Sequence, residues 1–167
     1  ALFWIIMLFA ATNAIARSFL QESRGLQLFN YILLDPSNVI LAKTTYNILL
    51  LAFLGFVNLI AFSLFFELPI IDLSQFLLGL LLGSFGLSAV LTLVSGIVAR
   101  AQSNAALVAI LGFPLLFPLL ITIIKVSQNA IEGASWASNQ PYWIVLFAVN
   151  SIIVTLSFLL FPYLWRE

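Results

Sequence analysis

Long apolar runs recur along this 167-residue chain, and they constrain its fold more than any other feature. Four of them are long enough for an α-helix that crosses about 30 Å of hydrocarbon. They lack the alternation of apolar and polar positions that the wall of a membrane β-barrel requires. The sequence therefore predicts an all-α, polytopic membrane helix bundle that forms one transmembrane domain, 1–167. The expected spans are 1–16, 44–66, 75–99, 105–125 and 142–165, with a polar loop over 126–141 before the last.

Composition agrees with this class and excludes several others. Hydrophobic residues make up 63% of the chain and charged residues 7%, too few charges to cover the surface of a soluble domain. The net charge of zero gives no electrostatic reason to expect nucleic acid as a partner. The sequence has no cysteine, no histidine and no phosphate-binding glycine loop. We therefore expect no catalytic residue, no metal site and no directly bound cofactor.

The first apolar run is slightly short for a full crossing, and the sequence starts inside it. No positively charged region precedes the run, so it does not fit a secretory signal peptide. We expect an N-terminal piece that includes a further span to be missing, so that the five visible spans belong to a bundle of six.

Basic residues are distributed unevenly between the two sides that alternating spans define. Five of the six lie on one side, in the segment 17–43, the turn at Arg100 and the C-terminus, whereas the other side has Lys125 alone. Cytoplasmic loops of membrane proteins carry such an excess of Lys and Arg. We therefore predict that 17–43, the Arg100 turn and the C-terminus are cytoplasmic.

The segment 17–43 is the only long stretch that mixes charged with apolar residues. Its first part, 17–34, has an imperfect amphipathic pattern with a bend at Gly25. Pro36 is expected to stop this helix, and Ser37 or Asn38 to cap the helix that leads into the next span. Two interpretations remain open: an interfacial helix that lies in the headgroups, and a docking surface for a cytoplasmic partner.

Gly79 and Gly83 form a GxxxG pattern, which Ser84 and Ser88 extend with further small residues. Small residues at this spacing let two helices approach closely in a membrane. The partner helix can belong to the same chain or to a second copy in a homodimer.

Other intramembrane signals are two prolines and two asparagines. Pro114 and Pro118 each remove a backbone hydrogen bond and should kink or break the span 105–125, either as a plain kink or as a moving gate. Asn58 and Asn150 fall near mid-span, where a polar side chain more often bonds a neighbouring helix than a substrate. No ionisable residue lies at mid-span, which argues against an ion-coupled transporter.

Four stretches resemble, in order and spacing from about residue 9 to residue 130, the haem exporter protein B (CcmB) family of cytochrome c maturation. They are RSFLQESRG at 17–25, LLDP at 33–36 with VILAK at 39–43, LLLG at 80–83, and LGFPLLFPLLI at 111–121. The last span matches only in hydrophobicity. The chain also departs from the family pattern at Arg24, where an acidic residue is common.

The resemblance implies a six-span, ABC-2-like permease subunit of the bacterial inner membrane, usually paired, that works with a separate cytoplasmic ATPase subunit (A). Other implied partners are the haem-handling C subunit, the small D subunit, the haem chaperone E and membrane lipid. ATP would act through the partner, and haem would be a substrate. Whether such a complex moves haem or releases the loaded chaperone is open, and Met7 is the only soft iron ligand in the sequence.

The resemblance also gives roles to two sets of residues. We expect 17–43 to be the coupling segment, in which Phe19–Leu34 docks on the ATPase. The coupling residues are Arg17, Phe19, Leu20, Glu22, Arg24, Gly25, Asp35, Pro36 and Lys43. The residues of helix packing or of a gate are Gly79, Gly83, Pro114 and Pro118. Two alternative functions are an ABC-2-type exporter of a lipid or other hydrophobic substrate, and a non-transporting scaffold for haem-delivery proteins.

Overall fold

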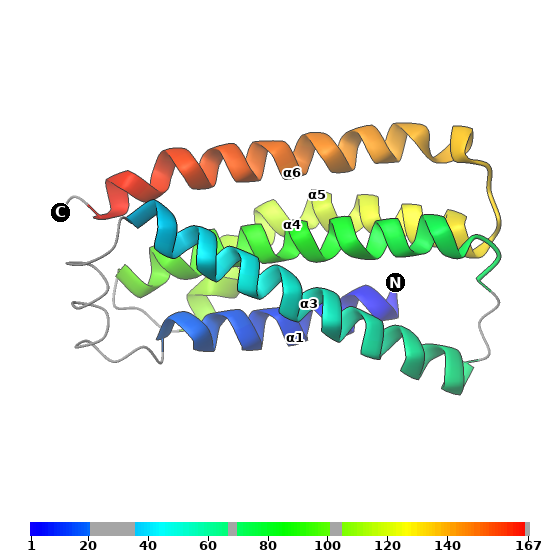
Figure 1. The fold of residues 1–167 in the computed structure, drawn as a ribbon, viewed down its shortest axis with the longest axis horizontal. Coiled ribbons are helices and arrows are strands. Elements are labelled where there is room, and N and C mark those ends of the chain that lie inside the picture. The colour runs from blue at the N-terminus through cyan, green and yellow to red at the C-terminus, as the bar shows by residue number, and fades with distance from the viewer. Residues whose placement is uncertain (21–35, 67–69, 101–104, 166–167) are drawn as a thin grey trace.

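The computed structural model describes residues 1–20, 36–66, 70–100 and 105–165, and these residues form a bundle of helices without a strand. Figure 1 shows the helices lying lengthwise beside one another. Four of them are long and apolar enough to cross a membrane, and α1 contributes a shorter apolar helix, Leu2–Ile15. The prediction of a polytopic membrane helix bundle is confirmed. The helices are α1 (Leu2–Leu20), α3 (Pro36–Phe66), α4 (Leu73–Arg100), α5 (Ala105–Ile131) and α6 (Trp136–Trp165).

Several helices extend beyond the expected boundaries. The first continues through Leu20, so the start of the predicted coupling segment belongs to α1. The expected loop over 126–141 is wrong, since α5 runs to Ile131 and α6 begins at Trp136. Residues 126–131 are helical because Val126 and Ala130 are fully buried in the bundle, so that packing overrides the polar residues between them.

The start of α3 also differs from the expected capping pattern. Pro36 is the first residue of the helix, and Ser37 and Asn38 lie in its first turn and do not precede it as caps. Proline suits this position because its ring presets the helical φ angle, and the first amides of a helix have no partner to lose.

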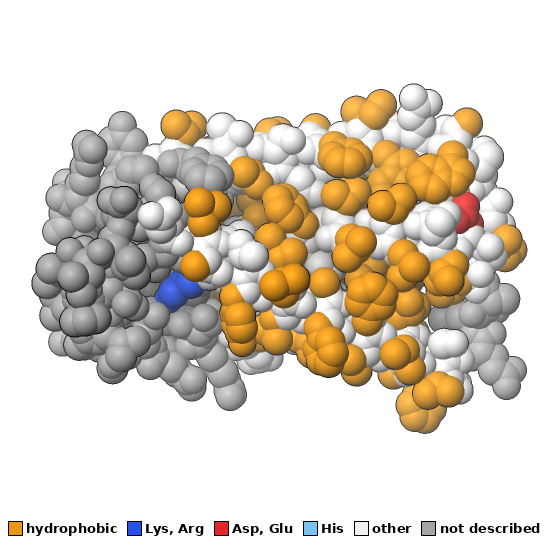
Figure 2. Space-filling model, in the orientation of Figure 1, with side chains coloured by type: hydrophobic (Ala, Val, Ile, Leu, Met, Phe, Trp, Pro, Cys, Tyr) orange, Lys and Arg blue, Asp and Glu red, His pale blue; other side chains and the backbone are white. Residues whose placement is uncertain are grey.

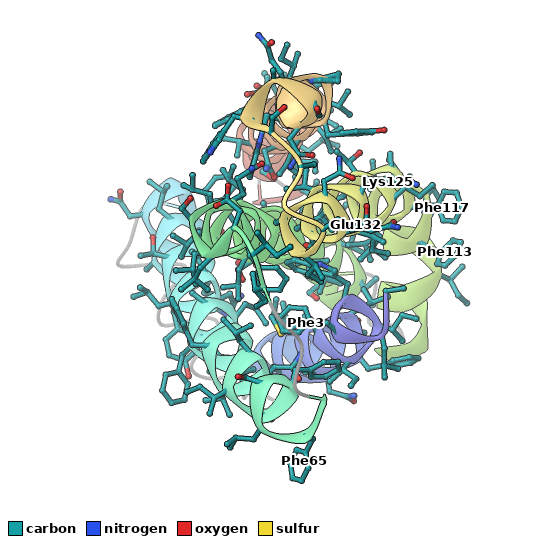
Figure 3. The ribbon with its side chains drawn as sticks, turned by 90° about the vertical axis from the view of Figure 1, so that its right-hand side faces the viewer. Phe3, Phe65, Phe113, Phe117, Lys125 and Glu132 are labelled. Atoms are coloured by element: carbon teal, nitrogen blue, oxygen red, sulfur yellow. The ribbon has the colours of Figure 1, made fainter. Side chains whose placement is uncertain are left out.

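The central helix of the bundle is α4. Of its apolar span 72% is buried inside the protein, against 11% for α3 and 17% for α6. It contacts each of the other four helices, and the end-on view in Figure 3 shows it between α6, α5, α1 and α3. The other helices therefore face the surroundings with more of their side chains, whereas α4 supplies more of the core than any other helix.

Hydrophobic side chains cover much of the face drawn in Figure 2, and the charged side chains visible there lie toward its two ends. This distribution suits a body whose middle lies in hydrocarbon. We name the end where α3 begins and α4 ends the Lys43 end, and the opposite end, where α4 begins, the Asp72 end (Figure 1).

Candidate functional site

α1 ends and α3 begins at the Lys43 end of the bundle (Figure 1), and the predicted coupling segment lies between them in the sequence. Its residues 21–35 lie outside the described residues, among them Glu22, Arg24, Gly25 and Asp35. The remaining coupling residues lie on helices: Arg17, Phe19 and Leu20 on the last turn of α1, and Pro36 and Lys43 on the first turns of α3. The structure therefore places the two ends of the segment on two helices that both contact α4.

Gly79 and Gly83 are buried inside the chain and allow close helix packing. A Cβ atom on Gly83 would collide with the side chain of Ile123 and would lie 2.6 Å from the Trp4 ring. At Gly79 the added atom would lie 3.3 Å from a methyl group of Val126. This face of α4 is occupied by α1 and α5, so a pairing of two copies would use another surface.

Both prolines lie inside α5, which stays helical from Ala105 to Ile131, so neither proline breaks the span. Their side chains are exposed beside Phe113 and Phe117, which are 57% and 53% exposed and point away from the bundle in Figure 3. The helix persists because its opposite face packs on the core through Leu116, Leu119 and Ile123. Neither proline ring lines the interior.

A network of polar side chains, the Asp72 cluster (Asp72, Ser74, Gln75, Asn129 and Asn139), joins three helices at the Asp72 end. The Asp72 carboxylate caps α4, accepting hydrogen bonds from the Gln75 backbone amide at 3.0 Å and the Ser74 hydroxyl at 2.6 Å. The Ser74 hydroxyl and then the Gln75 amides lower the pKa of Asp72 to about 2, because they bind its charged form.

Gln75 is the centre of this cluster and is fully buried. Its Nε2 donates to Asp72 Oδ2 at 2.8 Å and to the Ala134 carbonyl at 2.9 Å. Its Oε1 accepts a hydrogen bond from Asn139 Nδ2, and Asn139 Oδ1 accepts one from Asn129 Nδ2 at 2.7 Å. These hydrogen bonds fix the start of α4 to the end of α5 and to the start of α6.

Sequence reasoning could have found only part of this cluster. Asp72 before Ser74 and an apolar run is a recognisable helix cap. The buried contacts of Gln75, Asn129 and Asn139 had no signal, because they join positions up to 64 residues apart.

Polar side chains also cross between helices deeper in the bundle. Asn58 Nδ2 donates to the Phe3 carbonyl and Asn150 Nδ2 to the Leu82 carbonyl, each at 3.3 Å, as predicted for asparagines that bond a neighbouring helix. Two further contacts were not predicted. They are Asn47 Nδ2 to Thr92 Oγ1 at 2.9 Å and Ser88 Oγ to the Thr44 carbonyl at 3.3 Å.

These hydrogen bonds fix the helices relative to one another. Within the described ranges no group of three His, Cys, Asp or Glu residues could hold a metal ion. Met7 is 1% exposed and lies in the hydrophobic core. The polar side chains that are buried are neutral amides and hydroxyls.

The fold and its buried polar contacts define a multi-pass helical membrane protein. The family model of the CcmB protein matches residues 1–163, and the chain belongs to this family. The match confirms the resemblance carried by the four stretches above and extends it through the last span. It supports a haem exporter membrane subunit of cytochrome c maturation, working in a system with other Ccm subunits. No curated protein and no solved structure matches the chain.

Proposed function

We propose that this chain is the permease subunit of an ABC transporter complex in the bacterial inner membrane, coupled to a separate ATPase subunit. The segment 17–43, the Arg100 turn and the C-terminus face the cytoplasm in this proposal. The ATPase docks on Phe19–Leu34, with Glu22, Arg24 and Asp35 as polar contacts. ATP is bound by the partner, and no cofactor is resident in this chain.

The observation that carries the proposal is the position of α1 and α3. They enter and leave the predicted coupling segment, and each contacts the buried helix α4. A displacement of the segment would therefore reach two sides of the central helix. Such transmission requires packed elements that continue from the docking site into the core.

In this proposal, ATP hydrolysis by the ATPase subunit drives the release of haem-loaded chaperone E in a complex with the C and D subunits. This choice over haem export rests on Met7, the only soft iron ligand of the sequence, whose side chain is enclosed by the core. A purified complex tests it: ATP should release loaded chaperone without haem crossing the bilayer of a sealed vesicle. ATP-dependent haem flux in the vesicles would favour the export alternative.

Docking is tested with the double variant Glu22→Gln/Arg24→Gln. It should lower both capture of the ATPase subunit and ATP turnover by the complex, because charged rim residues set association. The matched control is Lys125→Gln/Glu132→Gln, which neutralises one basic and one acidic exposed residue away from the segment. Unchanged capture and turnover in the first variant would remove the docking role.

Orientation is tested in the same chain, which has no cysteine of its own. A membrane-impermeant thiol reagent added to intact cells should label Ser135→Cys, in the α5–α6 turn, and should not reach Arg24→Cys. Labelling of position 24 from outside would place the segment beyond the reach of any cytoplasmic ATPase.

A further inference from the structure

Four hydroxyl side chains lie along one face of α4 and form what we name the hydroxyl ladder: Ser84, Ser88, Thr92 and Ser95. Their spacings of four, four and three residues put successive rungs one helical turn apart, about 4.5–6 Å. All four are buried, with exposed fractions of 0% or 1%. The ladder therefore lies inside the bundle.

The two middle rungs are bonded to α3. Ser88 Oγ donates to the Thr44 carbonyl at 3.3 Å, and Asn47 Nδ2 donates to Thr92 Oγ1 at 2.9 Å. Thr44 and Asn47 lie one turn apart on α3. Two residues of α3 that lie one turn apart are thus hydrogen-bonded to two residues of α4 that also lie one turn apart.

Three polar atoms next to these hydrogen bonds have no partner among the described residues: the hydroxyl groups at the two ends of the ladder and the side-chain oxygen of Asn47. Within the described part of the chain, Ser84 Oγ, Ser95 Oγ and Asn47 Oδ1 are buried and have no hydrogen-bond partner. Buried polar groups are nearly always satisfied, so three unpartnered polar atoms on two packed helices need an explanation. Asn47 Oδ1 is an unpartnered acceptor and the Ser95 hydroxyl an unpartnered donor, so the two groups could bond each other.

We propose that the hydroxyl ladder is a two-position ratchet, along which α3 moves by one helical turn toward Ser95. In the second position the Asn47 amide meets Ser95 and the Thr44 carbonyl meets Thr92. Both interhelical hydrogen bonds are exchanged for equivalent ones, so the two positions are close in free energy. One-turn steps between packed helices are an established form of bistable switching.

The rest of the bundle allows α3 to move while its partner stays fixed. Only 11% of the apolar span of α3 is buried, and the Asp72 cluster ties α4 to α5 and α6 at the far end. The movement would break the 3.3 Å hydrogen bond from Asn58 to the Phe3 carbonyl. It would also separate the Leu80 side chain from Gly55, against which it packs. These contacts favour the arrangement described here in the absence of a load.

The load would come from the coupling segment, because the last residues of that segment, 36–43, form the first turns of α3. In this respect the inference rests on the proposed function and deepens it. The ratchet itself is a property of α3 and α4 and can be tested without the ATPase.

Disulfide trapping in the cysteine-free chain tests the step. The pair Asn47→Cys/Thr92→Cys reports the described position, and Asn47→Cys/Ser95→Cys reports the second position. The matched control is Asn47→Cys/Val98→Cys, one turn further along α4 at a buried position without a hydroxyl. In the isolated protein the 47/95 pair should close more slowly than 47/92 but clearly faster than 47/98.

Adding the ATPase with ATP should raise the ratio of 47/95 to 47/92 product by roughly fivefold or more, the lower range of coupling between two sites. A 47/95 rate equal to that of 47/98, alone and in the complex, would overturn the ratchet. Capture of the ATPase is measured on the same samples. Failed capture would contradict the proposed function, whereas faster closure of 47/95 than of 47/98 in the isolated protein would still support the ratchet.

A second measurement avoids the paired cysteines. Ser95→Ala removes the unpartnered hydroxyl group at the end of the ladder, whereas Ser95→Thr keeps a hydroxyl group there. The alanine variant should lower ATP-driven turnover several-fold with unchanged ATPase capture, and the threonine variant should retain it. Equal turnover in the two variants would contradict a role for the Ser95 hydroxyl.

Discussion

Asn139 donates a hydrogen bond from Nδ2 to Oε1 of Gln75 at 2.5 Å, and this contact joins the first turns of α6 and α4. Both side chains are fully buried, and each makes further hydrogen bonds within the Asp72 cluster. A fully satisfied polar network of this kind rigidifies the elements that it joins. The Asp72 cluster thus ties its three helices together, whereas the contact of Asn47 on α3 with Thr92 on α4 leaves Asn47 Oδ1 unpartnered within the described ranges.

Gln75→Leu should destabilise the protein strongly, because it leaves Asn139 Nδ2 and the Ala134 carbonyl without their partner. Each buried group left unsatisfied costs about 1–3 kcal/mol. The midpoint of thermal unfolding in detergent measures the effect. Gln140→Ala, at an exposed position nearby, is the control and should leave the midpoint unchanged. Equal midpoints for the two variants would contradict the role given to the network.

Asp72 should make stability depend on acidity. Its pKa in the folded protein is about 2, below the ordinary 3.8, so its stabilising effect is complete above about pH 4 and is lost as the pH falls toward 2. The unfolding midpoint of the unmodified protein should therefore drop across this range. Asp72→Asn should drop less over the same range, because the amide does not titrate. Glu132→Gln is the comparison for a change of charge at the same end, and a parallel drop in Asp72→Asn would contradict the assignment.

Gly83→Ala should cost more stability than Gly79→Ala. The new methyl group on Gly83 collides with Ile123 and with the Trp4 ring, whereas the one on Gly79 comes no nearer than 3.3 Å to Val126. Overpacking of this kind costs about 1–3 kcal/mol. Unfolding in a denaturing detergent gives the difference. Similar losses in the two variants would mean that the bundle relaxes around Gly83.

Hydropathy predicted the helices well, because a backbone in hydrocarbon must form its hydrogen bonds within its own segment, so an apolar run of sufficient length becomes a helix. It failed at 126–131, where Val126 and Ala130 pack into the core and keep polar neighbours in the helix. The pairing of Asn47 with Thr92 was missed for a related reason. A polar residue in an apolar run shows that a partner is needed. The identity of the partner depends on the register of two packed helices, and Asn47 and Thr92 are 45 residues apart in sequence.

Pro114 and Pro118 on α5 were predicted to form either a plain kink or a moving gate, and their substitution distinguishes the two. Both prolines are exposed on α5. The neighbouring Phe113 and Phe117 are exposed as well and point away from the bundle in Figure 3. The double variant Pro114→Ala/Pro118→Ala restores two backbone amides without adding volume to the core, so it should keep or raise the unfolding midpoint. It should also retain ATP-driven turnover, because neither ring contributes to the packed interior. Leu119→Ala on the buried face is the contrasting control and should destabilise by about 2–5 kcal/mol. A stable double variant that has lost turnover would show that the prolines act as a gate, and the exposed position of their rings would then need another explanation.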